Sequence, residues 1–482
     1  MKRTARNIII LLVVLIVLGG AVLLLMKLPT EDSGDESSGS SSSEAVERAA
    51  LFDREDTDVE SVEIKNSEDE YTIIPKTEDS SLGFTLQGYE DFDFNTSQVA
   101  ANVRTVLGFE ASKELGSQEN LDAFGLGSGG AKLTMNYKDG SSDQLVLGDL
   151  SPETNGRYVL KDGQVYIVAG VPGSFLESKF SYFYTAVYTV PDMTEVTVDD
   201  EGESTESVVE DRLDYMTLSG GHFPEQISVK PSSKYLSGYG ITEPITAETG
   251  NTKFTELMTS LKSLSASSVV DAGVTDEKLE QYGLSEPDAS ISFSLNGVEH
   301  EVSVSAKDSD GMRYMIADGN NIVYQVENSA VTNWADAGLM DLRMSYVWIA
   351  NIKDVKKLTV ILDGDQVKTY EITREKNEEK STDTSTEYDI TKIIDAGGSS
   401  IDYEVYQPFY QKMIGVAVFT VEAAEYSGEP TVKIEYEYFN GGTNTVEYYE
   451  IPGMSRYAAV LDGKYNGQVR GTDLDAMIEM VP

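Results

Sequence analysis

The chain has 482 residues, which is enough for roughly three domains of about 150 residues each. Its 82 acidic and 37 basic residues give a net charge of −45, which argues against binding to nucleic acid or to an anionic membrane surface. The absence of Cys and the presence of only two His exclude disulfides, thiolate chemistry and multi-histidine metal sites within one chain.

The N-terminus combines a basic flank with a long apolar stretch. Three basic residues lie within the first six, and no charge interrupts the run from Asn7 to Met26. Some 20 helical residues cover about 30 Å, the thickness of the hydrocarbon core. No small-x-small cleavage site follows, and no Cys is present for lipid attachment. Residues 1–28 are therefore predicted to be a retained transmembrane anchor; a cleaved signal peptide is the alternative.

The position of the basic flank predicts the topology of the anchor. Lys2, Arg3 and Arg6 precede the apolar run, and positive charge favours the cytoplasmic side. We expect a single-pass protein of the cell membrane with its N-terminus in the cytoplasm and the bulk of the chain outside. Residues 29–58, rich in Ser, Gly and acid, are predicted to be a disordered linker, because they offer too little apolar surface to fold.

One sequence block recurs along the rest of the chain. It runs from Leu121 to Val168, again from Leu279 to Val326, and more faintly from Glu429 to Val469. The spacing between copies is too long for a solenoid repeat and suits whole domains. We therefore predict repeat module 1 at residues 59–190, repeat module 2 at residues 205–343 and a divergent repeat module 3 at residues 346–482.

Each module has patterns for a hairpin, a helix, two further hairpins and a closing helix. Period-two alternation predicts the strands, and helical periodicity predicts helices from Asn95 or Thr96 to Leu107 and from Thr252 to Leu264. The predicted closing helices are Pro172–Tyr184, Val331–Leu342 and a helix with Thr472 as its N-cap. Pro408 interrupts the expected helix of module 3. The predicted fold class is α+β: a transmembrane helix and three antiparallel-sheet-plus-helix modules.

Two short motifs mark the block. A Leu-x-x-aromatic-Gly-Leu step opens the first two copies, and an Arg-Tyr pair lies in all three. We interpret both motifs as structural, with each Tyr in the sheet core and each Arg covering it with its stem. The signature residues are Leu121, Phe124, Gly125, Leu126, Arg157 and Tyr158 in the first copy, Leu279, Tyr282, Gly283, Leu284, Arg313 and Tyr314 in the second, and Arg456 and Tyr457 in the third.

Three stretches imitate ligand-binding motifs. Gly125-x-Gly127-x-x-Gly130 matches a dinucleotide fingerprint, but a strand pattern follows it where the fingerprint needs a helix. Asp308-x-Asp310-Gly311 and Asp363-Gly364-Asp365 contain part of a calcium loop, although neither supplies the full ligand set. We predict turns at both acidic stretches and leave weak calcium binding open.

Catalytic signals are weak. His300 alternates within a strand and is expected to face solvent, whereas His222 lies in a loop, where functional residues are more frequent. No Ser lies in a Gly-x-Ser-x-Gly elbow. With 82 acidic residues, the sequence cannot select a carboxylate pair for glycoside cleavage. We predict no catalytic residue, no cofactor and no metal site.

The combination of these motifs resembles a known bacterial family. The basic-then-apolar N-terminus, the Leu-x-x-aromatic-Gly-Leu step, Glu286-Pro287 after its second copy and the Arg-Tyr strand pair are similar to domain of unknown function 4340. Genes for this repeated domain often lie beside genes for ABC transporters related to gliding-motility export components. The resemblance implies membrane-anchored extracytoplasmic modules and a transporter partnership, and it implies no catalytic residues.

The sequence thus predicts a non-enzymatic, membrane-anchored repeat protein outside the cytoplasm that mediates protein–protein contacts. Its expected partners are ABC transporter subunits or other surface proteins. The first alternative is an extracytoplasmic binding protein for a cell-wall glycan, a peptide or a divalent cation. The second alternative is a hydrolase with a carboxylate pair.

Overall fold

The computed structural model describes residues 49–77, 83–152, 154–198, 203–382 and 385–482. The predicted membrane anchor and most of the predicted linker lie outside the described residues. Among the described residues, none of the helices has the length and apolar character needed to cross a membrane. Residues 49–58, assigned above to the linker, are folded: Leu51 and Phe52 are buried, because Leu51 donates its N–H to Phe109 O (2.8 Å) and joins the first core.

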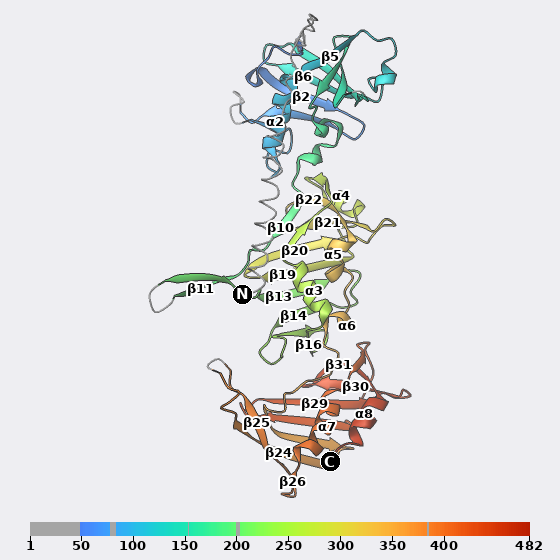
Figure 1. Cartoon of the computed structure of the whole chain (residues 1–482). Helices are drawn as coiled ribbons and strands as arrows, with labels where there is room; N and C mark the ends of the chain where they lie inside the picture. The colour runs from blue at the N-terminus through green and yellow to red at the C-terminus, as the bar shows by residue number, and fades with distance from the viewer. Residues whose placement is uncertain (1–48, 78–82, 153, 199–202, 383–384) are drawn as a thin grey trace, which may run out of the picture. The chain divides into compact units, whose positions relative to one another are not determined.

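Three nine-stranded sheets make up most of the described chain (Figure 1). The first has the order β1-β5-β9-β8-β7-β6-β2-β3-β4. Its strands are β1 (Ala49–Ala50), β2 (Val59–Lys65), β3 (Glu70–Pro75), β4 (Phe84–Leu86), β5 (Glu110–Gly116), β6 (Ala131–Tyr137), β7 (Ser142–Leu150), β8 (Gly156–Lys161) and β9 (Gln164–Ala169). Helix α2 (Thr96–Leu107) and the 3-10 turns η1 (Asp56–Asp58), η2 (Leu121–Phe124), η3 (Gly173–Leu176) and η4 (Lys179–Tyr182) accompany it.

The second sheet has the order β16-β15-β14-β13-β19-β20-β21-β22-β18. Its strands are β13 (Leu213–Ser219), β14 (Ile227–Pro231), β15 (Tyr239–Glu243), β16 (Ala247–Glu248), β18 (Ser268–Ala272), β19 (Ala289–Leu295), β20 (Val298–Val304), β21 (Met312–Ala317) and β22 (Ile322–Glu327). Its helices are α3 (Thr252–Ser260), α4 (Asp276–Gln281), α5 (Asn328–Ala335) and α6 (Leu339–Leu342). A short strand, β17 (Ser263–Ser265), pairs outside this sheet with β10 (Ala186–Thr189).

The third sheet has the order β26-β25-β24-β23-β28-β29-β30-β31-β27. Its strands are β23 (Val355–Leu362), β24 (Gln366–Lys376), β25 (Tyr388–Asp395), β26 (Ser400–Ile401), β27 (Val418–Thr420), β28 (Val432–Tyr438), β29 (Thr443–Glu450), β30 (Arg456–Leu461) and β31 (Lys464–Arg470). Its helices are α7 (Tyr403–Ile414) and α8 (Gly471–Ile478).

The three sheets share the order of eight strands; the ninth is β1 beside β5 in the first sheet, but β16 and β26 at the opposite edge in the second and third. In each, the first strand of the opening hairpin pairs antiparallel with the first strand of the recurring block: β2 with β6, β13 with β19, and β23 with β28. The last strand of each block pairs with the strand that follows the helix. In this sheet-rich α+β architecture, the four strands of the block are neighbours in every sheet. The first of them lies beside the opening hairpin, and the last lies beside the strand that follows the helix.

Several predicted helices differ from the structure. α3 ends at Ser260, and the residues predicted to continue it form β17 instead. The predicted helix at the end of module 2 is divided into α5 and α6. α7 forms although Pro408 lies inside it, because Tyr406, Phe409 and Met413 are buried on one face. α8 begins at Gly471 with Arg470 at the N-cap position, so Thr472 is not the cap.

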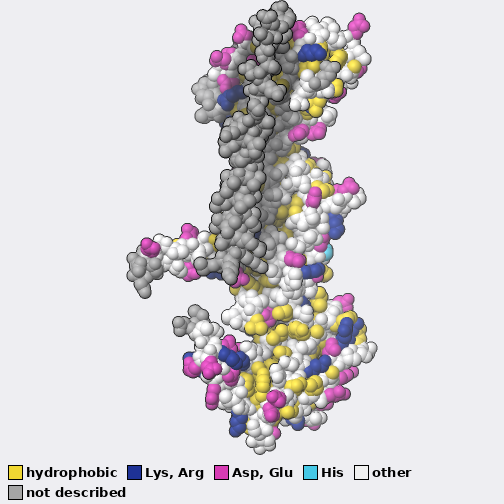
Figure 2. Space-filling model, viewed as in Figure 1, with side chains coloured by type: hydrophobic (Ala, Val, Ile, Leu, Met, Phe, Trp, Pro, Cys, Tyr) yellow, Lys and Arg dark blue, Asp and Glu magenta, His cyan; other side chains and the backbone are white. Residues whose placement is uncertain are grey.

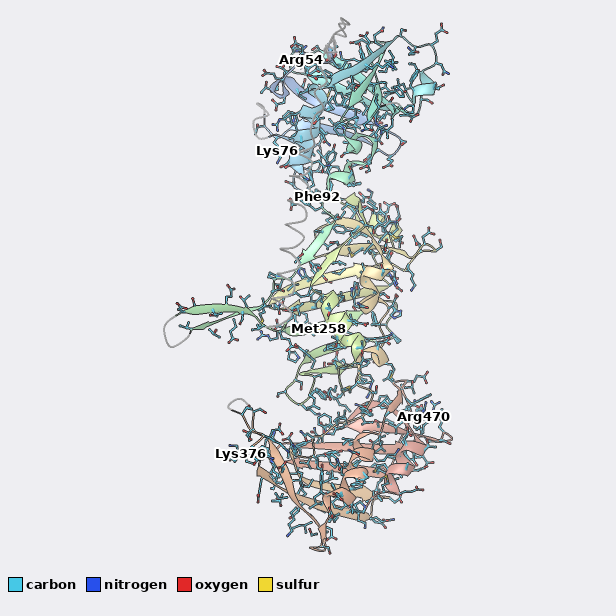
Figure 3. The ribbon with its side chains drawn as sticks, in the orientation of Figure 1. Arg54, Lys76, Phe92, Met258, Lys376 and Arg470 are labelled. Carbon is cyan, nitrogen blue, oxygen red and sulfur yellow. The ribbon has the colours of Figure 1, made fainter. Side chains whose placement is uncertain are left out.

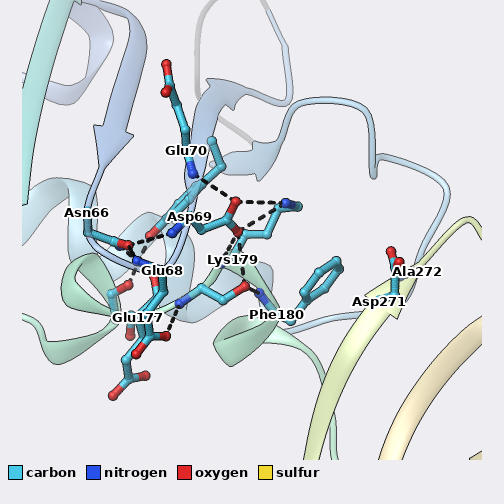
Figure 4. A network of polar contacts seen from close by, with 12 residues as sticks. Asn66, Glu68, Asp69, Glu70, Glu177, Lys179, Phe180, Asp271 and Ala272 are labelled. Carbon is cyan, nitrogen blue, oxygen red and sulfur yellow. Dashed lines mark hydrogen bonds and ion pairs between the residues drawn. The ribbon is translucent and has the colours of Figure 1, made fainter. Parts of the chain in front are cut away.

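The predicted helix Pro172–Tyr184 is replaced by η3 and η4 because the β2–β3 turn binds its backbone (Figure 4). Asn66 Nδ2 donates to Phe175 O at 3.1 Å and to Glu177 O at 2.7 Å. Asp69 Oδ2 accepts from Lys179 N at 3.1 Å and pairs with Lys179 Nζ at 3.0 Å. Burial acts to raise the pKa of Asp69, but the bonds from Lys179 outweigh it and hold that pKa below its usual value.

A buried arginine ties the end of the second module to the third sheet. Arg343 is 1% exposed, and its guanidinium donates only to oxygen atoms of uncharged groups. Nε donates to Met344 O (2.9 Å), Nη2 to Tyr346 O (3.1 Å) and to Asn466 Oδ1 (2.9 Å), and Nη1 to Asn466 O. Asn466 Nδ2 in turn donates to Thr246 O at 2.6 Å. Burial lowers the pKa of Arg343 to about 10, so its side chain remains charged at neutral pH.

Candidate functional site

The Leu-x-x-aromatic-Gly-Leu step is a helix-ending motif. In the first copy, Leu126 N donates to Leu121 O at 3.0 Å and Gly125 N donates to Asp122 O at 3.1 Å. In the second copy, Leu284 N donates to Leu279 O at 2.8 Å and Gly283 N donates to Glu280 O at 3.0 Å. Gly125 and Gly283 have φ values of +67° and +68°, which glycine adopts without strain. The motif is thus a Schellman cap, and its spacing follows from backbone geometry.

The aromatic residue of the cap packs against the Tyr of the Arg-Tyr pair. The rings of Phe124 and Tyr158 lie 4.9 Å apart at 78°, and those of Tyr282 and Tyr314 lie 4.8 Å apart at 61°. Leu279 and Leu284 join Tyr282 and Tyr314 in a small apolar cluster separate from the main core. The two signature motifs therefore form one packing unit with a structural role, and in the second copy Tyr282 Oη also donates to Asp271 Oδ2 at 3.2 Å.

The arginine of the pair lies on the face opposite the tyrosine, because neighbouring residues of a strand alternate. Arg313 is 2% exposed, whereas Tyr314 is half-buried. Tyr158 and Tyr457 are half-buried as well. The interpretation above, with Tyr in the sheet core and Arg covering it, is therefore wrong for the second copy: the arginine is the buried member.

Arg313 donates hydrogen bonds to four acceptors. Nη1 pairs with Asp288 Oδ2 and Nη2 with Asp336 Oδ1, each at 2.7 Å, and Nε donates to Asn328 Oδ1 at 2.6 Å. Nη1 also donates to Ser305 O at 2.6 Å. Burial acts to raise the pKa of Asp336, but its hydrogen bonds and the charge of Arg313 keep it below the usual value. This network holds β21 to the start and end of α5, and it gives Arg313 a structural role.

The same arginine has different surroundings in the other copies. Arg157 Nη1 donates to the backbone oxygen of Gly148, and Arg456 Nη1 donates to Gln468 Oε1 at 3.4 Å. Among the described residues, no carboxylate forms an ion pair with Arg157 or Arg456. The three arginines thus share a strand position, but each has different hydrogen-bond partners.

The remaining candidate residues have structural surroundings. A strand, β6, follows Gly130. Asp308 Oδ1 accepts from Asp310 N (2.9 Å) and Met312 N (2.8 Å), as in a turn, and Asp363-Gly364 lies between β23 and β24. Across the described ranges, no group of three or more His, Asp or Glu residues is placed to hold a metal ion. The side chain of His300 is only 11% exposed and stacks on Tyr188 at 4.0 Å, so its predicted solvent-facing position is wrong.

His222 lies at the mouth of a pocket of about 680 Å³. The pocket is formed by the β13–β14 loop, the start of α6 and the segment after β27. Two tyrosines, Tyr426 and Tyr465, stack with ring centroids 6.1 Å apart, and Tyr465 Oη donates to Glu422 O at 2.5 Å. Glu225 and Glu422 supply the only acidic groups of the lining. The apolar lining residues are Phe223, Pro224, Ile227, Pro244, Ile245, Ala337, Leu339, Val421, Ala423 and Ala424.

A two-stranded hairpin projects between β10 and β13 (Figure 1). Its strands, β11 (Thr194–Val198) and β12 (Ser204–Val208), pair antiparallel, and all ten residues are exposed. Val196 lies opposite Glu206, and Val208 lies opposite Thr194, so these residues share one face with Val198. The three valines are 60%, 67% and 68% exposed in chain order. One face of the hairpin therefore carries three exposed valines together with Thr194, Ser204 and Glu206, whereas the other carries Glu195, Thr197, Thr205 and Ser207.

The hairpin is firmly attached at its root. Lys262 Nζ pairs with Asp192 Oδ1 at 3.0 Å and with Asp211 Oδ1 at 2.7 Å, just before β11 and just after β12. Asn296 Nδ2 donates to Asp211 Oδ1 at 2.7 Å and to Pro191 O at 3.0 Å. Burial acts to raise the pKa of Asp211, but the bonds from Lys262 and Asn296 keep it below its usual value. The root therefore fixes the direction in which the valine face points.

Sequence reasoning missed this hairpin because the acidic stretch around it was interpreted as a boundary between modules. The signal was present: Thr-Glu-Val-Thr-Val and Ser-Thr-Glu-Ser-Val each alternate with a period of two. Acidic residues crowd the surface as a whole, and Figure 2 shows Asp and Glu side chains scattered over the visible described face. The three valines lie together on one face of a projecting hairpin within this acidic surface.

Comparison with known proteins identifies the family. The family model described as Domain of unknown function (DUF4340) matches residues 85–272 and residues 240–405. The chain belongs to the DUF4340 family. No curated protein and no solved structure matches the chain.

The two DUF4340 matches confirm the predicted family and its repetition within the chain. They overlap at residues 240–272, which run from β15 to the end of β18. The second match ends inside α7, so the recurring block of the third sheet lies beyond both. The third sheet nonetheless has the strand order of the second. Its topology therefore persists where the DUF4340 sequence pattern does not.

Proposed function

We propose that the chain is a non-enzymatic, membrane-anchored repeat protein outside the cytoplasm that mediates protein–protein contacts as an accessory of an ABC transport complex. The observation that supports contact formation is the uncovered valine face of the β11–β12 hairpin. The apolar N-terminal stretch supports the anchor, and the family resemblance supports the transporter.

The energetics of the hairpin favour a partner. An isolated two-stranded hairpin in water is marginally stable at best. Covering a valine side chain completely contributes about 1.5–3 kcal/mol, so three valines could supply much of the binding free energy. The ion pairs of Lys262 hold the root in place, which reduces the entropy lost on docking.

The negative charge of the chain limits which surfaces can bind the hairpin. Glu206 lies among the valines, and the chain carries a net charge of −45, so a second copy would be repelled. The complementary surface is an apolar strip flanked by Lys or Arg. We propose that an extracytoplasmic part of a transporter subunit presents this strip, with backbone pairing along the hairpin edge as an additional contribution.

Photo-crosslinking from the two faces of the hairpin tests this proposal. A benzophenone amino acid is placed at Val196 or Val208 on the apolar face, and at Glu195 or Ser207 on the polar face, in the full chain in its native cells. We expect adducts with an identified transporter subunit from positions 196 and 208, at least tenfold above positions 195 and 207. The adducts are identified by mass spectrometry.

The polar-face positions are matched controls, since they lie on the same strands and are also exposed. The triple variant Val196→Ser, Val198→Ser, Val208→Ser should abolish co-purification of the same subunit and leave the rest of the fold intact. Equal labelling from both faces, or adducts without any transporter subunit, would refute the transporter contact.

A second candidate function is the binding of a peptide or another small ligand, favoured by the pocket beside His222. Its apolar lining, its stacked tyrosines Tyr426 and Tyr465, and its acidic residues Glu225 and Glu422 suit a segment with both apolar and basic side chains. We expect a short Lys- and Leu-containing peptide to bind the full chain, measured by calorimetry, and Ala424→Trp to block it. A glycan array or calcium titration with the only positive signal would favour a glycan or a cation instead.

A further inference from the structure

Two arginines lie side by side on the third sheet without an acidic partner. Arg456 in β30 and Arg470 in β31 are direct cross-strand partners. Like charges placed opposite each other on neighbouring strands destabilise a sheet. The chain has 82 acidic residues, yet among the described residues neither guanidinium forms an ion pair with a carboxylate. An arrangement that is repulsive by itself indicates a group that compensates the charge from outside.

One aromatic ring holds both guanidinium groups. The guanidinium carbons of Arg456 and Arg470 each lie 4.6 Å from the ring centroid of Phe419, which is 42% exposed. A ring face attracts cations, so the ring of Phe419 favours the presence of both guanidinium groups beside it. Within the described structure, the two guanidinium groups make one hydrogen bond between them, from Arg456 Nη1 to Gln468 Oε1 at 3.4 Å.

A hollow and the N-terminus of a helix lie beside Arg470. Phe419, Arg470 and Asp473 line a hollow of about 310 Å³ together with Ala417 and Val418. α8 begins directly after Arg470, so its positive end faces this region, and no side chain caps it. Asp473, in the first turn of α8, makes no ion pair with Arg470. Figure 3 labels Arg470 at this end of the third sheet.

The second module has an arginine at the position equivalent to Arg456. Arg313, at the position equivalent to Arg456, is neutralised by Asp288 and Asp336. At the equivalent positions the third module has Thr431 and Glu479. Among the described residues Arg456 forms no ion pair with Glu479, and a second arginine, Arg470, lies opposite it. The arginine charge that two carboxylates neutralise in the second module is therefore not neutralised in this way in the third.

We propose that Arg456, Arg470 and Phe419 form a binding site for a phosphate group. Paired guanidinium groups donate parallel N–H bonds that match phosphate oxygens, and two positive charges suit an anion with up to two negative charges. The group is supplied either by a small phosphomonoester or by a phosphodiester such as a lipid headgroup or a polymer unit. This inference is independent of the hairpin and of the transporter contact.

Calorimetric titration of the full chain in a zwitterionic detergent tests the site. Inorganic phosphate, glycerol 3-phosphate and glycerophosphoglycerol are compared at constant ionic strength. We expect saturable binding at one site, weakened at least tenfold by Arg456→Gln or Arg470→Gln and less by the corresponding Lys substitutions, which keep the charge but lose the planar fork. Preference for glycerophosphoglycerol identifies a phosphodiester source, whereas preference for the other two ligands identifies a small monoester.

Arg212→Gln and Arg104→Gln are matched controls, because both arginines are exposed and pair with Asp214 and Asp56. They should leave phosphate binding unchanged. Far-ultraviolet circular dichroism and Trp348 emission establish that each variant is folded. The proposal is overturned if none of the three ligands binds, or if the folded glutamine variants bind them as the unmodified chain does.

Discussion

Replacing Arg313 by alanine is expected to destabilise the second module by about 3–5 kcal/mol, the usual cost of breaking a buried ion pair from one side. The guanidinium is 1% exposed and neutralises both Asp288 and Asp336. Its removal leaves Asp288 without its ion-pair partner and leaves Asp336 with only Lys307, 3.4 Å away. Urea unfolding of the full chain in detergent, followed by Trp334 emission, measures the loss; Trp348→Phe in every variant makes Trp334 the sole tryptophan.

The chain contains its own control for this experiment. Arg157 occupies the same strand position in the first sheet, is half-buried, and donates to the backbone oxygen of Gly148. Arg157→Ala should leave the Trp334 transition in place and cost the first module about 1 kcal/mol. An Arg313→Ala variant whose Trp334 transition is shifted by less than 1 kcal/mol would contradict the role assigned to the network.

Replacing Arg343 by alanine is the second large effect expected, about 3 kcal/mol on the unfolding of the third module. Four acceptor contacts disappear, and two of them are on Asn466, whose backbone oxygen remains buried without this donor. Trp348 lies close by in sequence, and its Nε1 donates to Tyr438 Oη at 3.0 Å. Its emission in a Trp334→Phe background therefore reports the transition.

Arg343→Lys separates charge from geometry. A lysine keeps the positive charge but has no planar fork, so it cannot reach Met344 O, Tyr346 O and Asn466 at once. We expect it to recover less than half of the loss. A lysine variant as stable as the original chain would mean that charge alone matters at this junction. Arg374→Ala, at an arginine stacked between Tyr388 and Phe439, is the control for losing a guanidinium elsewhere in the same module.

Local sequence patterns predicted the features that depend on neighbouring residues. Asn95 was expected to begin a helix, and its side chain does accept from Gln98 N at 3.0 Å. The Leu-x-x-aromatic-Gly-Leu spacing pointed to a structural role, and the Schellman cap accounts for it through two backbone bonds and a positive φ. Alternation likewise indicated the strands of the recurring block.

Features that depend on distant residues could not be predicted in the same way. Residues 173–182 have a helical pattern, but Asn66 and Asp69 capture their backbone from more than a hundred positions away. Pro408 disfavours a helix locally, and burial of Phe409 and its neighbours outweighs that cost. Arg313 is buried because it forms ion pairs with Asp288 and Asp336. These partners are distant in sequence, so the residues around Arg313 do not indicate the contact.

The shared topology has a consequence for the order in which the chain can fold. In each sheet the central pairing joins residues roughly eighty positions apart: Val59 with Tyr137, Leu213 with Leu295, and Val355 with Tyr438. The opening hairpin of a module must therefore wait until most of that module has been synthesised before its exposed edge is covered. During synthesis, β2, β13 and β23 each have one edge without its partner strand for that interval. Folding is thus expected to be slow within a module and sequential between modules, a situation in which a strongly acidic chain protects itself from aggregation by charge repulsion.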